Sequence, residues 1–151
     1  MKKILIILLL TIATILPTFA SSWVKVGEWQ YIDKDNIKYY VNDYGTIDYQ
    51  KKTFWRKDTD TNQDYMINIE KICNKKIGYI VTQEIIDYQK KQIASKSIII
   101  YDENSNVITS FNNRDFQLEW HSIVPDSVGE IWYELVKSPR KLKKIYKEQV
   151  Q

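Results

Sequence analysis

The side chains best suited to acid–base, nucleophilic or metal chemistry are scarce in this chain. Its 151 residues include one histidine, His121, and one cysteine, Cys73. These two ligands cannot complete the four-ligand set of a structural zinc site, and a Ser/His/Asp or Cys/His mechanism would have to use His121. Asp126 and Ser127 follow closely, but the sequence has no G-x-S-x-G nucleophile elbow. We therefore predict no enzyme and expect His121 to be structural or to face solvent.

A run of oxygen-bearing side chains is the other candidate for site chemistry. The segment 58–64 (DTDTNQD) places three aspartates and an asparagine at alternate positions, which is the spacing of the ligands in an EF-hand calcium loop. The sixth position of such a loop needs glycine and is Gln63 here, and the twelfth needs a bidentate glutamate and is Ile69. We therefore expect a solvated hairpin loop at 58–64, with no metal ion and no cofactor.

Length and composition fit a single folded domain. The chain is 44% hydrophobic and 27% charged, with four glycines and three prolines, which excludes a disordered, collagen-like or low-complexity chain. The single cysteine excludes a disulfide-rich mini-protein. No catalytic motif is evident, so compartment, architecture and family resemblance have to carry the functional prediction.

The first twenty residues predict export. Residues 1–20 (MKKILIILLLTIATILPTFA) combine two lysines, an apolar stretch over 4–16 and small residues before a cut after Ala20, the pattern of a secretory signal peptide. The alternative is a membrane anchor, but 13 apolar residues closed by Pro17 are fewer than the roughly 20 that span a bilayer. We expect a cleaved leader, a mature chain of 131 residues, and a location in the periplasm, at the cell surface or outside the cell.

Positive charge is concentrated at the two ends of the chain. The net charge is +3, but 21–134 carries 14 basic and 18 acidic residues, whereas 137–148 carries six basic residues and one acidic residue. Export and a slightly acidic domain both disfavour a nucleic-acid partner. We divide the mature chain into a domain over 21–138 and a basic tail or short helix over 139–151. The candidate binding residues of this tail are Arg140, Lys141, Lys143, Lys144 and Lys147.

The basic tail also has an apolar stripe. Leu142, Ile145 and Tyr146 lie at helical spacing between the basic residues, the pattern of a helix that lies on an anionic membrane or binds an acidic polysaccharide. A solvated chain end is the plain alternative. A helix of about 11 residues is marginal by itself, so it must either dock or fray.

Alternating polarity predicts that most of the mature chain is strand. Short segments rich in aromatic and β-branched residues, separated by polar turns, favour an antiparallel sheet of about six strands. The expected strands are 28–33, 49–57, 65–73, 77–88, 98–101 and 107–111, the last two forming a hairpin. Cys73 would end the third strand on an apolar face, so we expect a buried small side chain. An intermolecular disulfide, and with it a homodimer, is the alternative.

The aromatic side chains and a C-terminal helix supply the rest of the predicted core. Five apolar residues recur at helical spacing between 128 and 136, after Pro125, and Lys137 ends the stretch. We therefore predict an α+β fold in which an amphipathic helix packs on one face of the sheet. Most of the early aromatic residues should be core, although an exposed binding patch is the alternative. The residues in question are Trp23, Trp29, Tyr31 and Trp55.

The residues around the start of this helix have a recognisable spacing. The pattern W-x-x-I-x-P-x-S-x-x-E is filled by Trp120, Ile123, Pro125, Ser127 and Glu130. An early YID, a Trp-bearing second strand and a segment that ends in Cys73 precede it. Together these features resemble the surface-adhesin protein E family of exported bacterial proteins over about 23–137. The resemblance implies a small antiparallel sheet with a C-terminal helix, export to the envelope, and adhesion to host matrix or serum proteins.

One feature departs from the family pattern. Members of the family usually pair the cysteine at the position of Cys73 with a second one just after the helix, at or beside Lys137 here. The resemblance therefore implies that Cys73 is the remaining half of a family disulfide. Packing would then have to replace the roughly 4 kcal/mol that closing such a loop contributes.

Two functional classes remain open from the sequence. The first is a non-enzymatic exported binding module of the adhesin E type, whose partner is a host matrix or serum protein or an anionic polysaccharide or membrane surface. The second is a soluble periplasmic housekeeping or small-ligand-binding protein with no adhesive role. The lack of a surface anchor other than the leader favours the second class.

Overall fold

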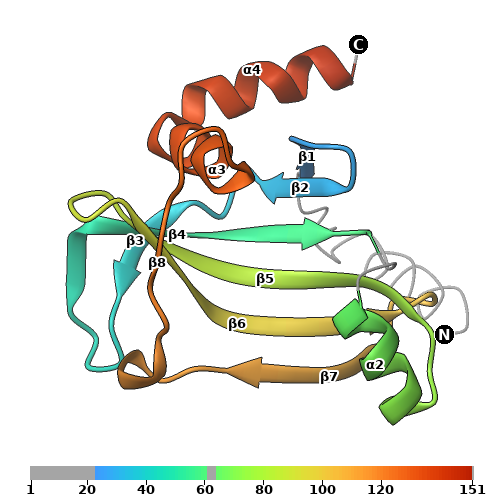
Figure 1. Cartoon of the computed structure of the whole chain (residues 1–151). Helices are drawn as coiled ribbons and strands as arrows, with labels where there is room; N and C mark the ends of the chain where they lie inside the picture. Colours follow the sequence, from blue (N-terminus) through green and yellow to red (C-terminus); the bar gives the residue numbers. More distant parts are fainter. Residues whose placement is uncertain (1–22, 61–63, 151) are drawn as a thin grey trace, which may run out of the picture.

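Eight strands form one antiparallel sheet in the computed structural model, which describes residues 23–60 and 64–150 (Figure 1). The predicted leader, 1–20, lies outside the described residues. The main order is β1-β2-β4-β5-β6-β7, with β3 paired to β4 and β8 paired to β6. The strand bounds are β1 Trp23–Lys25, β2 Gln30–Asp33, β3 Lys38–Val41, β4 Ile47–Asp58, β5 Ile77–Asp87, β6 Gln92–Asp102, β7 Val107–Asn112 and β8 His121–Ser122.

Three α-helices and one 3-10 turn complete the described fold. They are α2 Asp64–Cys73, η1 Asp115–Gln117, α3 Val128–Lys137 and α4 Pro139–Gln149. The predicted α+β class is confirmed, and so are the helix after Pro125 and the hairpin of β6 and β7. The short strands β1, β3 and β8 are additions to the predicted set. Within the ranges 23–60 and 64–150 no helix is long and apolar enough to cross a bilayer.

Most buried apolar residues lie on one face of the sheet, whereas Ile85 and Ala94 pair with each other on the opposite face. Phe54 of β4 pairs across from Glu84 of β5, and Ile80 of β5 pairs with Ile100 of β6. Positions 80, 84 and 86 alternate onto the same side of β5, so all these residues face one way. The three helices pack against this face in two groups, α3 and α4 at one end and α2 at the other (Figure 1).

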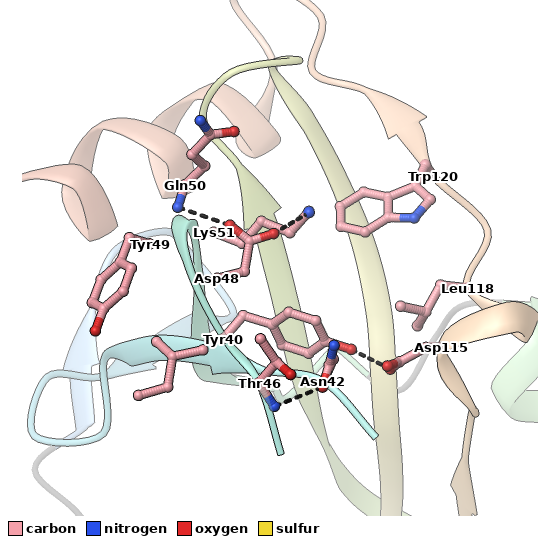
Figure 2. Close-up of a pocket in the computed structure, with 11 residues that line it drawn as sticks. Tyr40, Asn42, Thr46, Asp48, Tyr49, Gln50, Lys51, Asp115, Leu118 and Trp120 are labelled. Carbon is pink, nitrogen blue, oxygen red and sulfur yellow. Dashed lines mark hydrogen bonds and ion pairs between the residues drawn. The ribbon is translucent and has the colours of Figure 1, made fainter. Parts of the chain in front are cut away.

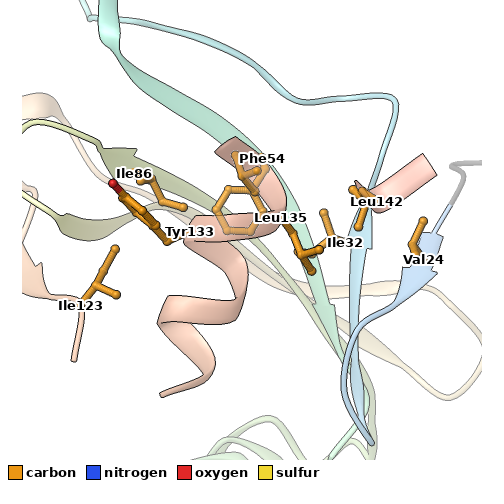
Figure 3. Close-up of a cluster of buried hydrophobic side chains, with 9 residues drawn as sticks. Val24, Ile32, Phe54, Ile86, Ile123, Tyr133, Leu135 and Leu142 are labelled. Atoms are coloured by element: carbon orange, nitrogen blue, oxygen red, sulfur yellow. The ribbon is translucent and has the colours of Figure 1, made fainter. Parts of the chain in front are cut away.

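The larger buried cluster joins α3 and α4 to the sheet (Figure 3). Phe54 and Ile86 are fully buried beneath Val136 of α3, and Leu142 of α4 is also fully buried. Trp132 packs at the edge of the cluster, with its ring centroid 6.4 Å from that of Phe54. The buried members are Val24, Ile32, Phe54, Ile86, Ile123, Tyr133, Leu135, Val136 and Leu142.

The predicted strand over 65–73 is wrong, because this segment is helix α2. Met66 is fully buried against Ile80 and Ile100, and Ile69 packs beside it three residues later, on the same helical face. Residues at strand spacing do not share an environment here, since Ile67 is exposed while Ile69 is packed. β4 ends at Asp58 and α2 begins at Asp64, so the expected hairpin between two strands is wrong; residues 61–63 of the segment 58–64 lie outside the described residues.

The expectation that the early aromatic residues fill the core is also wrong. Trp29 is 50% exposed, and Trp23, Tyr31 and Trp55 are only partly buried. On the sheet face opposite the helices, the Lys57 ammonium lies 4.7 Å from the ring centroid of Tyr31 and 5.2 Å from that of Trp23. Burial among these rings lowers the pKa of Lys57. Trp23 and Tyr31 thus flank a cation, while aliphatic side chains make most of the core.

Gly78 stands at a close approach between backbones. A Cβ at this position would lie 2.5 Å from the carbonyl oxygen of Asp102 and 2.9 Å from the Cα of Glu103. The pairing of β5 and β6 is irregular at the same place, between Ile77 and Tyr79. Only glycine allows the strands to come this close without a backbone shift.

We therefore expect Gly78→Ala to lower the free energy of unfolding by about 1–3 kcal/mol, because the backbone must move to admit the methyl group. Gly27→Ala is the matched control, since its added Cβ would meet only the flexible Gln30 side chain, at 3.3 Å. The control should change stability by about 0.5 kcal/mol or less. Urea unfolding followed by circular dichroism measures both variants, and equal stabilities would contradict the close approach.

Candidate functional site

The predicted basic tail is a docked helix. Leu142 of α4 is fully buried, and Ile145 and Tyr146 pack against the same cluster as α3. Gln149 fixes the far end, because its amide accepts a hydrogen bond from the backbone N–H of Lys25 (3.1 Å) and donates to the Lys25 carbonyl (2.8 Å). The apolar stripe of α4 is therefore used within the protein.

The opposite side of α4 carries the predicted basic residues on an exposed surface, which we call the α4 basic face. Within the described structure, the one ion pair of these residues joins Lys141 to Glu134 at 3.9 Å. Both side chains are more than half exposed, so solvent weakens that pair. The face is an open cluster of positive charge. Its residues are Arg140, Lys141, Lys143, Lys144 and Lys147.

The family signature explains how α3 starts. Ser127 caps the helix, and its hydroxyl oxygen accepts the backbone N–H of Glu130 at 3.3 Å. The Glu130 carboxylate in turn accepts the backbone N–H of Asp126 at 2.9 Å. Ile123 is buried in the cluster beneath α3, whereas Pro125 is exposed ahead of the cap. These signature residues hold structure, as their spacing indicates.

Trp120, the remaining signature residue before the helix, lines a pocket that the sequence did not predict. The pocket has a volume of about 580 Å³ and lies between the β3–β4 hairpin and the segment that joins η1 to β8. We call it the hairpin pocket. Figure 2 shows Trp120 and Leu118 on one side and Asp48 and Lys51 on the other, with the Tyr40 ring between them.

A polar network closes one end of the hairpin pocket. The Asp115 carboxylate accepts hydrogen bonds from the Tyr40 hydroxyl and from the backbone N–H of Asp43. The Asp43 carboxylate in turn accepts a hydrogen bond from the backbone N–H of Asp115 at 2.8 Å. Lys96 bridges both carboxylates, at 2.7 Å from Asp43 and 2.8 Å from Asp115. These contacts join segments that are more than 70 residues apart in the sequence.

The same network shifts the titration of its members. Burial alone would raise the pKa of Asp115, but hydrogen bonds from Lys96 and Tyr40 outweigh it and lower that pKa to about 2. Burial and the adjacent Asp115 carboxylate raise the pKa of Tyr40. At neutral pH the Asp115 carboxylate is therefore ionised and the Tyr40 hydroxyl is neutral, and both groups are bound to partners within the network.

The other charged group at the pocket is also paired. The Lys51 ammonium donates to the Asp48 carboxylate and lies 3.7 Å from Asp87. It also lies 5.9 Å from the ring centroid of Trp120. The hydrogen bond from Lys51 lowers the pKa of Asp48. Burial alone would lower the pKa of Lys51, but Asp48 and Asp87 outweigh burial and raise it.

Apolar side chains stand exposed on the elements that carry the pocket. Tyr44 in the β3–β4 turn is 91% exposed, and Phe116 of η1 is 87% exposed. Clustered exposed aromatic residues are typical of binding surfaces. The exposed apolar residues of these elements are Tyr39, Val41, Tyr44, Ile47, Tyr49 and Phe116.

The single histidine and the single cysteine lie on separate elements of the fold. His121 is exposed on β8, as expected. Cys73 is the last residue of α2 and is partly exposed, so the expectation of a buried strand residue is wrong. Figure 1 places α2 and the end of α3 at opposite ends of the molecule, whereas disulfide-bonded Cα atoms lie within about 7 Å. In this fold Cys73 is therefore not placed for a disulfide to position 137, and its origin as half of a family disulfide stays a prediction. The described part of the chain holds no cluster of three metal-ligating side chains.

These features define an α+β domain in which helices cover one face of an antiparallel sheet and leave surface sites elsewhere. The crystal structure of protein E from non-typeable Haemophilus influenzae has a similar fold, with a TM-score of 0.50 and 12% sequence identity. The match covers 88% of this chain and 92% of that one. No model of a known family matches the chain, and no curated protein matches it in sequence. The resemblance that the sequence motifs suggested is thus confirmed for the fold.

The depressed pKa of Asp115 predicts a pH-dependent contribution to stability. Because the folded-state value of about 2 lies below the ordinary 3.8, ionised Asp115 stabilises the fold at pH values above the ordinary pKa. This contribution is lost as the pH falls through the folded-state pKa. We expect Asp115→Asn to have a lower free energy of unfolding than the wild type near neutral pH. This difference in stability should shrink between pH 4 and pH 2.

Urea unfolding at a series of pH values measures this gap. Glu119→Gln is the control, since Glu119 is exposed and forms no ion pair within the described residues; its stability should track that of the wild type throughout. A gap for Asp115→Asn that is constant down to pH 2 would contradict the role assigned to the network.

Proposed function

We propose that the chain is an exported, non-enzymatic binding module that uses the α4 basic face to hold an anionic polysaccharide. The observation that carries this proposal is the docking of α4, which fixes five basic side chains outward on a rigid helix. Fixed charges lose less conformational freedom on binding than charges on a frayed tail. The segment 21–134, by contrast, has more acidic than basic residues, so the positive surface is local.

The docking of α4 favours a polysaccharide over a membrane as the partner. A helix that binds in a bilayer surface buries its apolar face among the lipid chains. In this structure Leu142, Ile145 and Tyr146 already pack against the protein core, so that face is not free. What remains for binding is electrostatic attraction, which suits a flexible, densely charged polymer.

The leader and the fold support the same location. The leader-like residues 1–20 predict export, and the fold is similar to that of protein E from non-typeable Haemophilus influenzae. With the motifs of the sequence, this likeness supports display at the bacterial surface. Adhesion to a host matrix or serum protein is a finer form of the proposal, in which the polysaccharide is carried by the host molecule.

Neutralising the α4 basic face should weaken binding to heparin, used as a soluble anionic polysaccharide. We expect the triple variant Lys143→Gln, Lys144→Gln, Lys147→Gln to bind heparin about tenfold less tightly at low salt, because three counterion-releasing contacts are lost. Calorimetric titration of the mature chain at several salt concentrations measures the change. The wild type should also lose affinity as salt rises.

The matched control makes the same change of charge elsewhere. Lys71, Lys75 and Lys90 are exposed and lie outside α4, so their replacement by Gln should leave most of the heparin affinity in place. Equal affinities for the two triple variants would overturn the assignment to α4. Binding to phosphatidylserine vesicles without binding to heparin would instead favour the membrane surface.

A second candidate function, a small-ligand-binding protein of the periplasm, is favoured by the hairpin pocket, whose volume suits a small molecule. Protease treatment of intact cells separates the two candidates. A surface-displayed chain should be cleaved before the outer barrier is broken, with a known periplasmic protein remaining intact as the control. A chain that is protected until the barrier is opened would contradict display at the surface.

A further inference from the structure

We infer that the hairpin pocket binds a neutral carbohydrate, stacked on Trp120. This inference rests on the second candidate function and is independent of the α4 basic face. The hairpin pocket lies within the usual range of about 300–1,000 Å³ for small-molecule sites. The sequence singled out Trp120 only as a structural signature, and the structure gives its ring a second role.

The charges at the pocket argue for an uncharged ligand. Lys51 is paired with Asp48 and Asp87, and Asp115 is held by Lys96 and Tyr40. Each ammonium is bound by two carboxylates, so the excess negative charge would repel an anionic ligand, and a cationic ligand would have to compete with Lys51 and Lys96 for carboxylates that they already bind. Breaking a partly buried charge pair is costly. A neutral ligand can enter without disturbing either pair.

The groups left for hydrogen bonding are neutral. Asn42 uses its side-chain oxygen to accept the N–H groups of Tyr44 and Thr46, at 3.0 and 2.8 Å. Its amide N–H₂, the Thr46 hydroxyl and the Trp120 indole N–H have no hydrogen-bond partner among residues 23–60 and 64–150, and all three side chains line the pocket. One amide, one hydroxyl and one indole donor suit a ligand that carries several hydroxyl groups.

The aromatic rings at the pocket suit the apolar face of a sugar ring. A pyranose ring has an apolar face of C–H groups, which packs flat against an aromatic ring while the hydroxyl groups point sideways to polar partners. Trp120 is partly exposed, and Figure 2 shows its ring beside the pocket, with Leu118 next to it. The exposed rings of Tyr49 and Phe116 lie on the elements that carry the pocket, and they can contact further sugar units of an oligosaccharide.

Saturation-transfer NMR on the full mature chain tests this inference. The probes are neutral di- and trisaccharides built from glucose, galactose, mannose and N-acetylglucosamine, with sialyllactose and a uronic-acid disaccharide as charged comparisons. We expect transfer to the ring C–H protons of at least one neutral probe. We expect Trp120→Ala to weaken that binding at least about tenfold, and Trp120→Phe, which keeps a ring, to retain part of it.

Two further variants keep the test decisive. Thr46→Val removes a hydroxyl at an exposed position and should weaken binding even if Trp120→Ala fails to fold. Trp29→Ala, at an exposed position remote from the hairpin pocket, should leave it unchanged. The inference is overturned by a wild-type protein that binds no neutral probe, by binding of charged probes alone, or by neutral binding that survives both Trp120→Ala and Thr46→Val. Heparin affinity should be unaffected by either change, so failure here is distinguishable from failure of the α4 proposal.

Discussion

The burial of one sheet face beneath α3 and α4 is the interaction on which the rest of the structure depends. Phe54 and Ile86 of the sheet meet Val136 and Leu142 of the two helices with no exposed surface. Burying each such side chain contributes about 1.5–3 kcal/mol. The one cysteine, Cys73, forms no disulfide, so this packing has to supply the stability that a cross-link would otherwise provide. Because the same contact uses the apolar side of α4, it also decides which side of that helix faces outward.

Polar contacts decide which charged groups are paired within the protein and which are left free for a partner. The network of Asp43, Lys96 and Asp115 ties the β3–β4 hairpin to η1 and holds both walls of the hairpin pocket in place. Each ammonium in these groups is bound by two carboxylates, Lys96 by Asp43 and Asp115 and Lys51 by Asp48 and Asp87, so each group carries one negative charge in excess. The α4 basic face differs in having almost no internal partners. The molecule therefore offers one basic surface on α4 and, at a separate place in the fold, one aromatic pocket whose charged groups are already paired within the protein.

The sequence predicted those elements whose information is local. The stripe that ends at Val136 and the lysine that follows it predict α3 without reference to the rest of the chain. The segment 65–73 could not be decided in this way, because its apolar residues fit strand and helix spacing alike, and only the burial of Met66 against Ile100 selects the helix. The hairpin pocket could not be predicted from the sequence for another reason. It depends on contacts such as that between Tyr40 and Asp115, 75 residues apart, which no local pattern records. The basic residues of α4 were predicted as a set, but their fixed orientation follows from tertiary docking.

Native-state hydrogen exchange of the α4 amides tests the central claim most directly, namely that the basic C-terminus is a docked helix and not a mobile tail. An undocked helix of this length would be open much of the time. The amides around Leu142 and Ile145 should therefore exchange with opening free energies close to those of α3, since both helices share one buried cluster. Exchange of the α4 amides at the rates of an unstructured peptide, while α3 remains protected, would contradict the account.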